Sequence, residues 1–285
     1  DGTFTGKNFQ VGANANETVS ISISAANTST LSNNTLEAHG DAVQQGLGTV
    51  TRGGTAGNNA VSQQTLTVTG SLGSDSAVDV AASDDAETIA AAVNAATGTT
   101  GVTATAVTKA ALTVADAGTV TFTLAGSASQ AISATLVSAS DLTALRDAIN
   151  DATGTTGVSA VGTGSTLTLT QADGKDIKIS NMASSTTAGG STVGTISALL
   201  ADGTAEATVG AAVNLTEGAT GSTLDSATVA GTVTFQSDSA FSVTTNVAGS
   251  AGAIIDQATA DTAVTSSATL LSSVNISTES GAQTA

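Results

Sequence analysis

A stretch of 56 residues occurs twice in the middle of this chain, and this duplication constrains the fold more than any other feature. Residues 94–104 read NAATGTTGVTA, and residues 150–160 read NDATGTTGVSA. The same offset aligns TLTVTGS, which starts at Thr65, with TFTLAGS, which starts at Thr121. Because a repeat of this length is a single supersecondary unit, we predict two sibling units. They span residues 64–119 and 120–175.

Within each copy the hydrophobic pattern predicts the order strand, strand, helix, strand, strand. Leu66 and Val68 alternate with polar residues as in a half-buried strand, and a second strand is expected near Val78. Ile89 and Val93 then share one helix face at positions i and i+4. The last two strands are expected at 102–107 and 111–114 in the first copy, and at 158–161 and 166–170 in the second. Each unit should therefore place one helix on a small sheet.

Polar residues and glycines predict where the two helices begin and end. Asp84 precedes Glu87 by three residues, which is an N-cap pattern, and Ser140 is the matching candidate in the second copy. Gly98 and Gly154 are expected to stop the helices, because glycine adopts a left-handed backbone at little cost. The buried stripe of the second helix is expected at Leu142, Leu145 and Ile149.

The composition favours an α+β fold that is mainly β, built from several small domains with thin cores. The 285 residues include five Phe and no Trp or Tyr, so the large aromatic side chains that fill many cores are scarce. The net charge of −17 and the lack of a basic patch exclude nucleic acid and anionic membranes as partners. The chain has no Cys, which excludes disulfides and Cys-ligated zinc. No apolar run is long enough for membrane insertion.

Few residues are candidates for chemistry. His39 is the single histidine, and a solvated or locally bonded side chain is expected there. Two carboxylate pairs, Asp84 with Asp85 and Asp173 with Asp176, match no calcium-loop spacing. We interpret the first pair as helix-start residues and Asp173-Gly174 as a hairpin turn.

Glycine and asparagine motifs also favour structural roles. The glycines of the two TGTTG segments follow a helix, whereas a phosphate loop must precede one. The Asn-x-Ser/Thr patterns occur at Asn16, Asn27, Asn33, Asn214 and Asn275, in a chain rich in these residue types. The sequence therefore predicts no catalytic residue, no metal site and no cofactor, although O-linked modification of the many hydroxyls stays open.

The two ends of the chain resemble bacterial flagellin. Residues 1–23 read DGTFTGKNFQVGANANETVSISI, which resembles the flagellin β-hairpin motif F-x-x-x-x-F-Q-[VI]-G-A-N of the D1 domain. Residues 270–285, LLSSVNISTESGAQTA, resemble the stretch that leads into the C-terminal D1 helix. The duplicated units also resemble a module of the outer part of flagellins and hook-associated proteins.

The resemblance implies a domain layout in which the chain passes out and back. We expect residues 1–27 and 270–285 to be a D1 remnant, with a hairpin and the start of a helix, in a fragment that lacks D0 and most D1 helices. Residues 28–63 and 176–269 would form a D2-like domain. Residues 64–175 would form a D3-like outer domain or two sibling lobes.

The resemblance also implies a non-enzymatic function. We expect an extracellular structural subunit of the flagellar filament that contributes to motility, whose partners are other flagellin subunits. The residues expected to pack in D1 and in assembly are Phe4, Phe9, Val11 and Ile276. An alternative is a cell-surface adhesin for polysaccharide, although an anionic glycan would need Lys175, Lys178 or bound cations, and sugar sites normally use the aromatic residues that are missing here.

Overall fold

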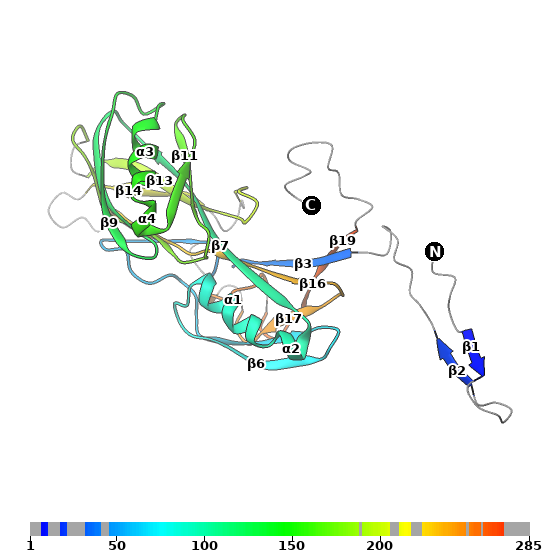
Figure 1. The fold of residues 1–285 in the computed structure, drawn as a ribbon. Helices are drawn as coiled ribbons and strands as arrows, with labels where there is room; N and C mark the ends of the chain where they lie inside the picture. Colours follow the sequence, from blue (N-terminus) through cyan, green and yellow to red (C-terminus); the bar gives the residue numbers. More distant parts are fainter. Residues whose placement is uncertain are drawn as a thin grey trace.

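The alternating segments fold into paired strands, and the apolar repeat segments form short helices between them (Figure 1). The computed structural model describes residues 7–10, 18–21, 32–40, 46–187, 190–205, 211–217, 224–248, 251–257 and 259–270, with side chains from residue 32 onward. The helices are α1 (Ala86–Ala95), α2 (Thr97–Thr100), α3 (Thr143–Asp151) and α4 (Thr153–Thr156). The fold is therefore α+β and mainly β, as the sequence predicts.

The strands of the described residues are distributed over four sheets. In chain order they are β1 (Lys7–Gln10), β2 (Thr18–Ile21), β3 (Ser32–Ala38), β4 (Val50–Gly53), β5 (Gln64–Thr69), β6 (Ser74–Val80), β7 (Thr103–Val114), β8 (Gly118–Ala125), β9 (Ser129–Leu136), β10 (Val158–Val161), β11 (Thr166–Gln171), β12 (Ile177–Ser184), β13 (Thr192–Leu199), β14 (Val213–Thr216), β15 (Ser226–Val229), β16 (Thr232–Ser237), β17 (Ser242–Thr245), β18 (Val264–Thr265) and β19 (Ser267–Leu270).

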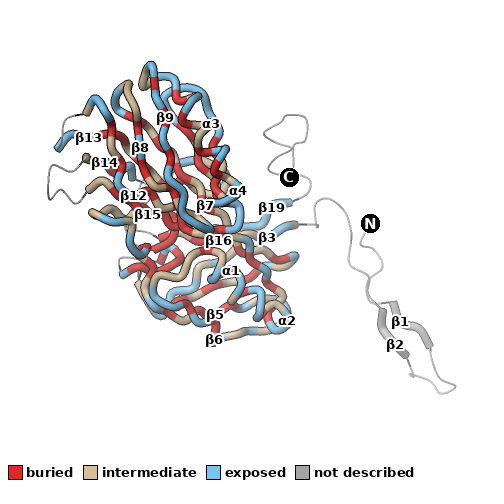
Figure 2. Tube along the Cα trace, turned by 60° about the vertical axis from the view of Figure 1, so that its left-hand side comes forward, coloured by how far each residue is buried: buried red, intermediate tan, exposed pale blue. Residues whose placement is uncertain are grey.

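Two clusters of buried hydrophobic residues lie within these sheets, one around each repeat helix (Figure 2). Ile89 and Val93 of α1 belong to the first cluster, and Leu145 and Ile149 of α3 belong to the second. These four side chains and Leu142 have no exposed surface, which confirms the predicted helix stripes. Each copy of the repeat therefore contributes the helix of its own lobe.

Each copy places its strands in two sheets, so the prediction of one small sheet per unit is wrong. The hairpin β5–β6 joins the four-stranded sheet β18-β17-β5-β6, and β8–β9 joins the five-stranded sheet β4-β15-β12-β8-β9. The later strands join an eight-stranded sheet with the path β10-β11-β7-β16-β3-β19, to which β13 and β14 are attached through β7. An alternating strand buries only one face, so each hairpin needs a second layer to cover that face.

Strand β7 connects the two lobes. Its first part, up to Val107, pairs with β16, and the part from Thr108 onward pairs with β11 and β13. The sequence predicted two strands here, at 102–107 and 111–114, and that break is wrong. Residues 108–110 are Thr, Lys and Ala, which supply no turn, so one strand of 12 residues continues through them.

The second copy turns back at the equivalent place, as predicted. Strands β10 and β11 form an antiparallel hairpin in which Val158 is opposite Gln171. Gly162 in the connecting loop has φ of +119°, which side chains other than glycine rarely adopt. The order strand, strand, helix, strand, strand is therefore confirmed for the second copy, whereas the first copy merges its last two strands.

The predicted helix ends need correction. Asp85, not Asp84, caps α1, because its carboxylate accepts a hydrogen bond from the Thr88 backbone N–H at 2.9 Å. At α3 the Asp141 carboxylate accepts from the Thr143 N–H at 3.0 Å, while Ser140 bonds to Ser138. The N-cap of α3 itself is Leu142, which makes no side-chain cap bond. The N-caps of α1 and α3 thus follow the predicted residues by one and two positions, a difference that sequence spacing alone does not resolve.

Gly98 and Gly154 do not end the helices. After α1 and α3 the chain makes one further short turn, α2 and α4, before it reverses. Gly101 and Gly157 end these turns with φ of +73° and +71°. The left-handed residue is therefore the second glycine of each TGTTG segment, because the first glycine lies inside the added turn.

The chain enters and leaves the body of the molecule on neighbouring strands. Strands β3 and β19 pair antiparallel, with Ser32 opposite Leu270. Figure 1 shows both strands at the same side of the molecule. The 239 residues from one strand to the other are therefore an out-and-back excursion whose two ends meet.

The predicted hairpin near the start of the chain is present. Strands β1 and β2 pair antiparallel, with Phe9 opposite Val19. The C-terminal helix expected within 270–285 lies outside the described residues, apart from Leu270, which belongs to β19.

The domain boundaries expected from the sequence stay a prediction. The cluster around α1 also contains Leu47 and Phe235, and the cluster around α3 also contains Val50 and Leu215. Segments 28–63 and 176–269 thus each contribute residues to both clusters. Each cluster, with the strands around it, is one lobe of the molecule. Each lobe contains one repeat helix and strands from both flanking segments.

Candidate functional site

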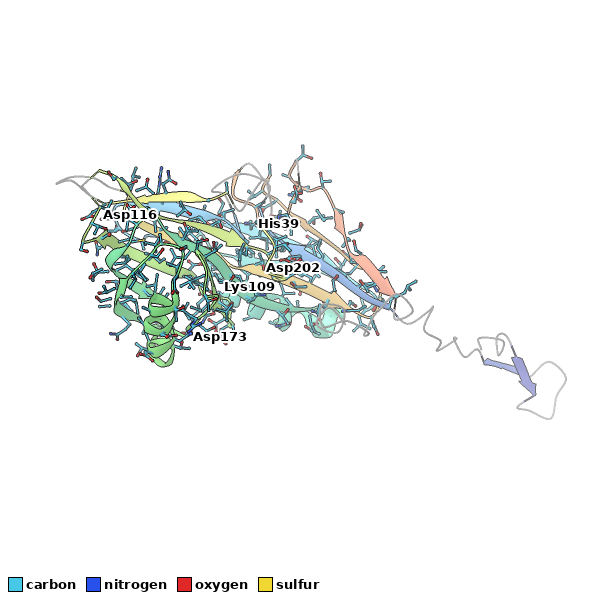
Figure 3. All side chains as sticks on the ribbon, turned by 90° about the horizontal axis from the view of Figure 1, so that it is seen from above. His39, Lys109, Asp116, Asp173 and Asp202 are labelled. Atoms are coloured by element: carbon cyan, nitrogen blue, oxygen red, sulfur yellow. The ribbon has the colours of Figure 1, made fainter. Side chains whose placement is uncertain are left out.

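Of the five titratable residues labelled in Figure 3, Lys109 and Asp202 lie near each other and interact, while Asp116 and Asp173 lie apart. The His39 ring Nδ1 is bonded to the Gly40 carbonyl oxygen at 2.9 Å, which matches the locally bonded histidine expected from the sequence. Among the described residues, no group of three His, Cys, Asp or Glu side chains lies close enough to hold a metal ion. The structure instead brings polar groups together where the end of the second repeat copy contacts the first.

Asp176 is the central residue of this contact. The residue is 8% exposed, and the Asn59 side-chain N–H donates to both carboxylate oxygens at 3.2 and 3.1 Å. Burial raises the pKa of Asp176 from 3.8 to about 6, although the Asn59 hydrogen bond and Lys178 lower it and Asp85 raises it. A buried carboxyl with such a partner is held in a single position.

The residues just before Asp176, Gly174 and Lys175, contact the first turn of helix α1. The Glu87 backbone N–H donates to the Gly174 carbonyl oxygen at 3.3 Å, and the Glu87 carboxylate forms an ion pair with Lys175. The ion pair is partly exposed, so it contributes little stability, while it raises the pKa of Lys175 through the hydrogen bond to Glu87. Gly174 approaches closely, because a Cβ added to it would lie 2.4 Å from the Ala106 Cβ.

We name residues 171–176 together with Asn59 the repeat clasp. Its geometry corrects the interpretation of Asp173-Gly174 as a hairpin turn. Strand β11 before it pairs with β7, whereas β12 after it pairs with β8 and β15, so the turn connects two different sheets. The Gln171 side-chain oxygen accepts from the Gly174 and Lys175 N–H groups and fixes this turn. Within the clasp, Gly174 and Lys175 therefore join the second copy to Glu87 of the first, and the Asp176–Asn59 bonds join the two flanking segments.

Sequence reasoning missed two residues of the clasp, Asn59 and Gln171. Neither belongs to a motif, and Asn59 lies 117 positions from its partner Asp176. Both are almost fully buried. Other polar residues surround both in the sequence, so no local signal singles them out.

The TGTTG segments form the same hydrogen bonds in both copies. The Asn94 side chain accepts from the Ala104 N–H at 2.8 Å and donates to its carbonyl oxygen at 2.9 Å, and Asn150 does the same to Ala160 at the same distances. The hydroxyls of Thr97 and Thr153 each donate to a backbone carbonyl oxygen at 2.8 Å. These bonds fasten the helix to the next strand, which explains the motif without a phosphate ligand.

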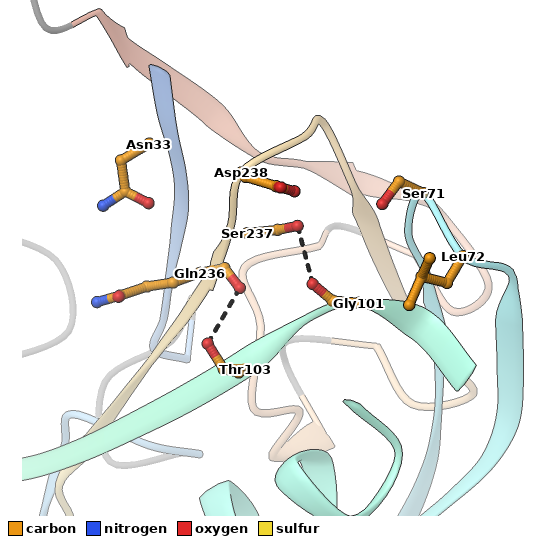
Figure 4. A pocket seen from close by; sticks show the side chains of 8 residues that line it. All are labelled: Asn33, Ser71, Leu72, Gly101, Thr103, Gln236, Ser237 and Asp238. Carbon is orange, nitrogen blue, oxygen red and sulfur yellow. Dashed lines mark hydrogen bonds between the residues drawn. The ribbon is translucent and has the colours of Figure 1, made fainter. Parts of the chain in front are cut away.

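A shallow groove of about 400 Å³ lies beside the end of α2 (Figure 4). Its walls are mostly small and polar, and the Ser237 hydroxyl donates to the Gly101 carbonyl oxygen at 2.9 Å. The lining residues are Asn33, Ser71, Leu72, Gly101, Thr103, Gln236, Ser237 and Asp238. Because no aromatic ring lines it, the groove has no stacking surface for a sugar, and the polysaccharide partner stays a prediction.

The residues expected to pack in D1 and in assembly cannot be placed as a group. Phe4, Val11 and Ile276 lie outside the described residues. Phe9 is in β1, opposite Val19, and only its backbone is described. Their assembly role stays a prediction.

The comparison with family models identifies the repeats. The flagellin hook IN motif matches the chain twice, at residues 65–118 and 119–173. These matches coincide with the two copies to within two residues. The chain is flagellin-like. A search of curated proteins found no match.

Flagellins are structural proteins of the flagellar filament. In both flagellin-like repeats here, the matching polar side chains bond to the protein's own backbone. In the part of the chain that the structure describes, no helix is long and apolar enough to cross a membrane.

Proposed function

We propose that this flagellin-like chain is a subunit of the flagellar filament and that residues 32–270 form its outward-facing variable region. The observation that carries the proposal is the pairing of β3 with β19, which sets Ser32 opposite Leu270. Because the first and last strands of residues 32–270 are neighbours, this region can project from a filament subunit while the segments before and after it stay close together.

The composition supports passage through a narrow export channel as an unfolded chain. Without Cys no disulfide can form before assembly, and without Pro no slow isomerisation delays folding at the filament tip. The net charge of −17 keeps the exposed bodies of neighbouring filaments apart and soluble. The outward region then forms the outer surface of the filament, which turns during motility.

Labelling of intact filaments tests this proposal. The chain has no native thiol, so a Val137→Cys variant carries a single reactive group at a side chain that is 95% exposed. We expect a membrane-impermeant maleimide to label filaments of this variant along their whole length. The matched control is Ala110→Cys, a fully buried position in β7, which should stay unlabelled until the protein is unfolded.

Two results would contradict the proposal. One is filaments that contain the Val137→Cys protein and exclude the reagent. The other is absence of the protein from filaments that the cell builds normally.

A further inference from the structure

Strand β9 ends the five-stranded sheet with an unusually regular edge. It pairs with β8 along eight residues, from Gly118 opposite Leu136 to Ala125 opposite Ser129, without a register shift. Among the described residues, no strand pairs with its other side. Figure 1 shows β9 along the outside of its lobe, away from β3 and β19. An open edge of this kind presents unpaired backbone groups to another strand.

The equivalent edge in the first copy is protected. Strand β6 ends the four-stranded sheet, and it carries Asp75 and Asp79. Its pairing with β5 also shifts register between Leu66 and Val68. Charges and irregular pairing are the devices by which proteins keep edge strands from joining other chains.

Strand β9 has neither device. The positions 56 residues after Asp75 and Asp79 are Ala131 and Thr135, and the sequence of β9, SQAISATL, contains no charged residue. Val137, the next residue, is 95% exposed. The first hairpins of the two copies therefore differ in their edge strand, which carries two charges in β6 and none in β9.

The geometry points to a second copy of this chain as the partner, with β9 pairing antiparallel to β9 of that copy. This inference goes beyond the proposed function and does not depend on it. Two chains that each carry a charge of −17 repel each other, so they approach most easily where the surface is uncharged. Self-pairing at β9 brings no two charged strand residues together.

The alternation of β9 fixes the register. Ile132, Ala134 and Leu136 are buried, and the residues between them are exposed. A two-fold axis at Ser133 places Ala131 opposite the partner's Thr135 and Ile132 opposite the partner's Ala134. Each face then continues across the contact, whereas a slip by one residue would join buried to exposed positions. This register also sets the exposed Val137 opposite Ser129.

Carboxylates beside the edge give the contact a salt dependence. Asp151 of α3 lies across a shallow groove from Gln130 and Ser133, and Asp141 and Asp147 lie beside Val137. The Arg146 side chain is bonded to Asp147 and neutralises part of this charge. Two copies in contact bring these groups nearer, so salt should strengthen the association by screening them.

Cysteine cross-linking of the full chain tests the register. Opposite residues of an antiparallel pair have Cα atoms about 4.5–5.5 Å apart, which a disulfide spans. We expect Ser133→Cys to form a disulfide dimer under mild oxidation, and a mixture of Ala131→Cys with Thr135→Cys to cross-link as a heterodimer. Thr121→Cys is the control, because Thr121 is exposed and opposite Ser133 but lies one strand inside the sheet.

Sedimentation of cysteine-free variants tests the edge itself. The double substitution Ala131→Asp and Thr135→Asp gives β9 the charges of β6 and should raise the dissociation constant by roughly tenfold or more, because like charges face each other twice. Thr121→Asp adds a charge to the same face of the neighbouring strand and should change the constant less. Equal cross-linking at positions 121 and 133, or a wild-type chain that stays monomeric at about 1 mM in high salt, would overturn the inference.

Discussion

The two repeat copies are alike where their sequences match and different where four residues diverge. The helix, the short turn after it and the asparagine that fastens them to the next strand have the same hydrogen bonds in both copies. Residues 106–109, AVTK, continue a straight strand, whereas residues 162–165, GTGS, form a loop. The shared motif thus sets local structure, and a short divergent stretch sets how the lobes are joined.

Replacement of the divergent stretch, residues 106–109, should change the free energy of unfolding the most. Replacing residues 106–109 by GTGS should break β7 and lower the free energy of unfolding by about 3 kcal/mol, because two glycines enter a strand interior and packing is lost. The lobes should then unfold in two steps instead of one. Denaturant unfolding followed by circular dichroism and hydrogen exchange measures both changes.

The control for this graft keeps the strand intact. Val107→Thr with Lys109→Ser leaves Ala106 and Thr108 in place and should preserve a single transition with a smaller loss. If the graft also unfolds in one step with little loss of stability, β7 is not what couples the copies.

The matching asparagines should give equal and intermediate effects. Asn94→Ala and Asn150→Ala each remove two hydrogen bonds to one strand residue and leave its backbone groups without these bonds. Each should cost about 1–3 kcal/mol in thermal or denaturant unfolding. Asn94→Asp and Asn150→Asp retain the acceptor but set a carboxylate oxygen against the strand carbonyl oxygen, so they should cost at least as much. A large inequality between the copies would contradict their shared geometry.

Asp176 gives an effect that appears only in one range of pH. Because the folded pKa of about 6 exceeds the unfolded value of 3.8, the folded protein holds a proton that the unfolded chain releases. This contribution to stability is complete below about pH 4 and is lost as the pH rises through about 6. Asp176→Asn removes the dependence and should be more stable than wild type at pH 8 by about 2 kcal/mol.

The measurement is the difference in unfolding free energy between wild type and Asp176→Asn from pH 3 to pH 8. Asp173→Asn is the matched control, because Asp173 is exposed in the same turn. A difference that stays constant across this range would show that burial does not perturb Asp176.

Sequence reasoning predicted what depends on local pattern. The stripes at Ile89 and Ile149 and the hairpin β10–β11 follow from periodicity and glycine placement. The N-cap of α1 at Asp85 was missed by one residue, because the neighbouring Asp84 offers an equivalent cap. The start of α3 at Leu142 was missed because that residue makes no side-chain cap bond. The continuous strand β7, which pairs with strands of both lobes, and the Asn59–Asp176 bond depend on segments far apart in the chain. No local sequence pattern reports such contacts.

The most direct test of the whole account is to remove the body at the place where its ends meet. In a complete filament subunit that carries this region, residues 33–269 would be replaced by Asn-Gly, a two-residue turn that joins paired antiparallel strands, so that Ser32 and Leu270 stay adjacent. The account predicts that the shortened protein is exported and still assembles into filaments, thinner than those of the wild type when viewed by electron microscopy. Export of the shortened protein without any filament would contradict it.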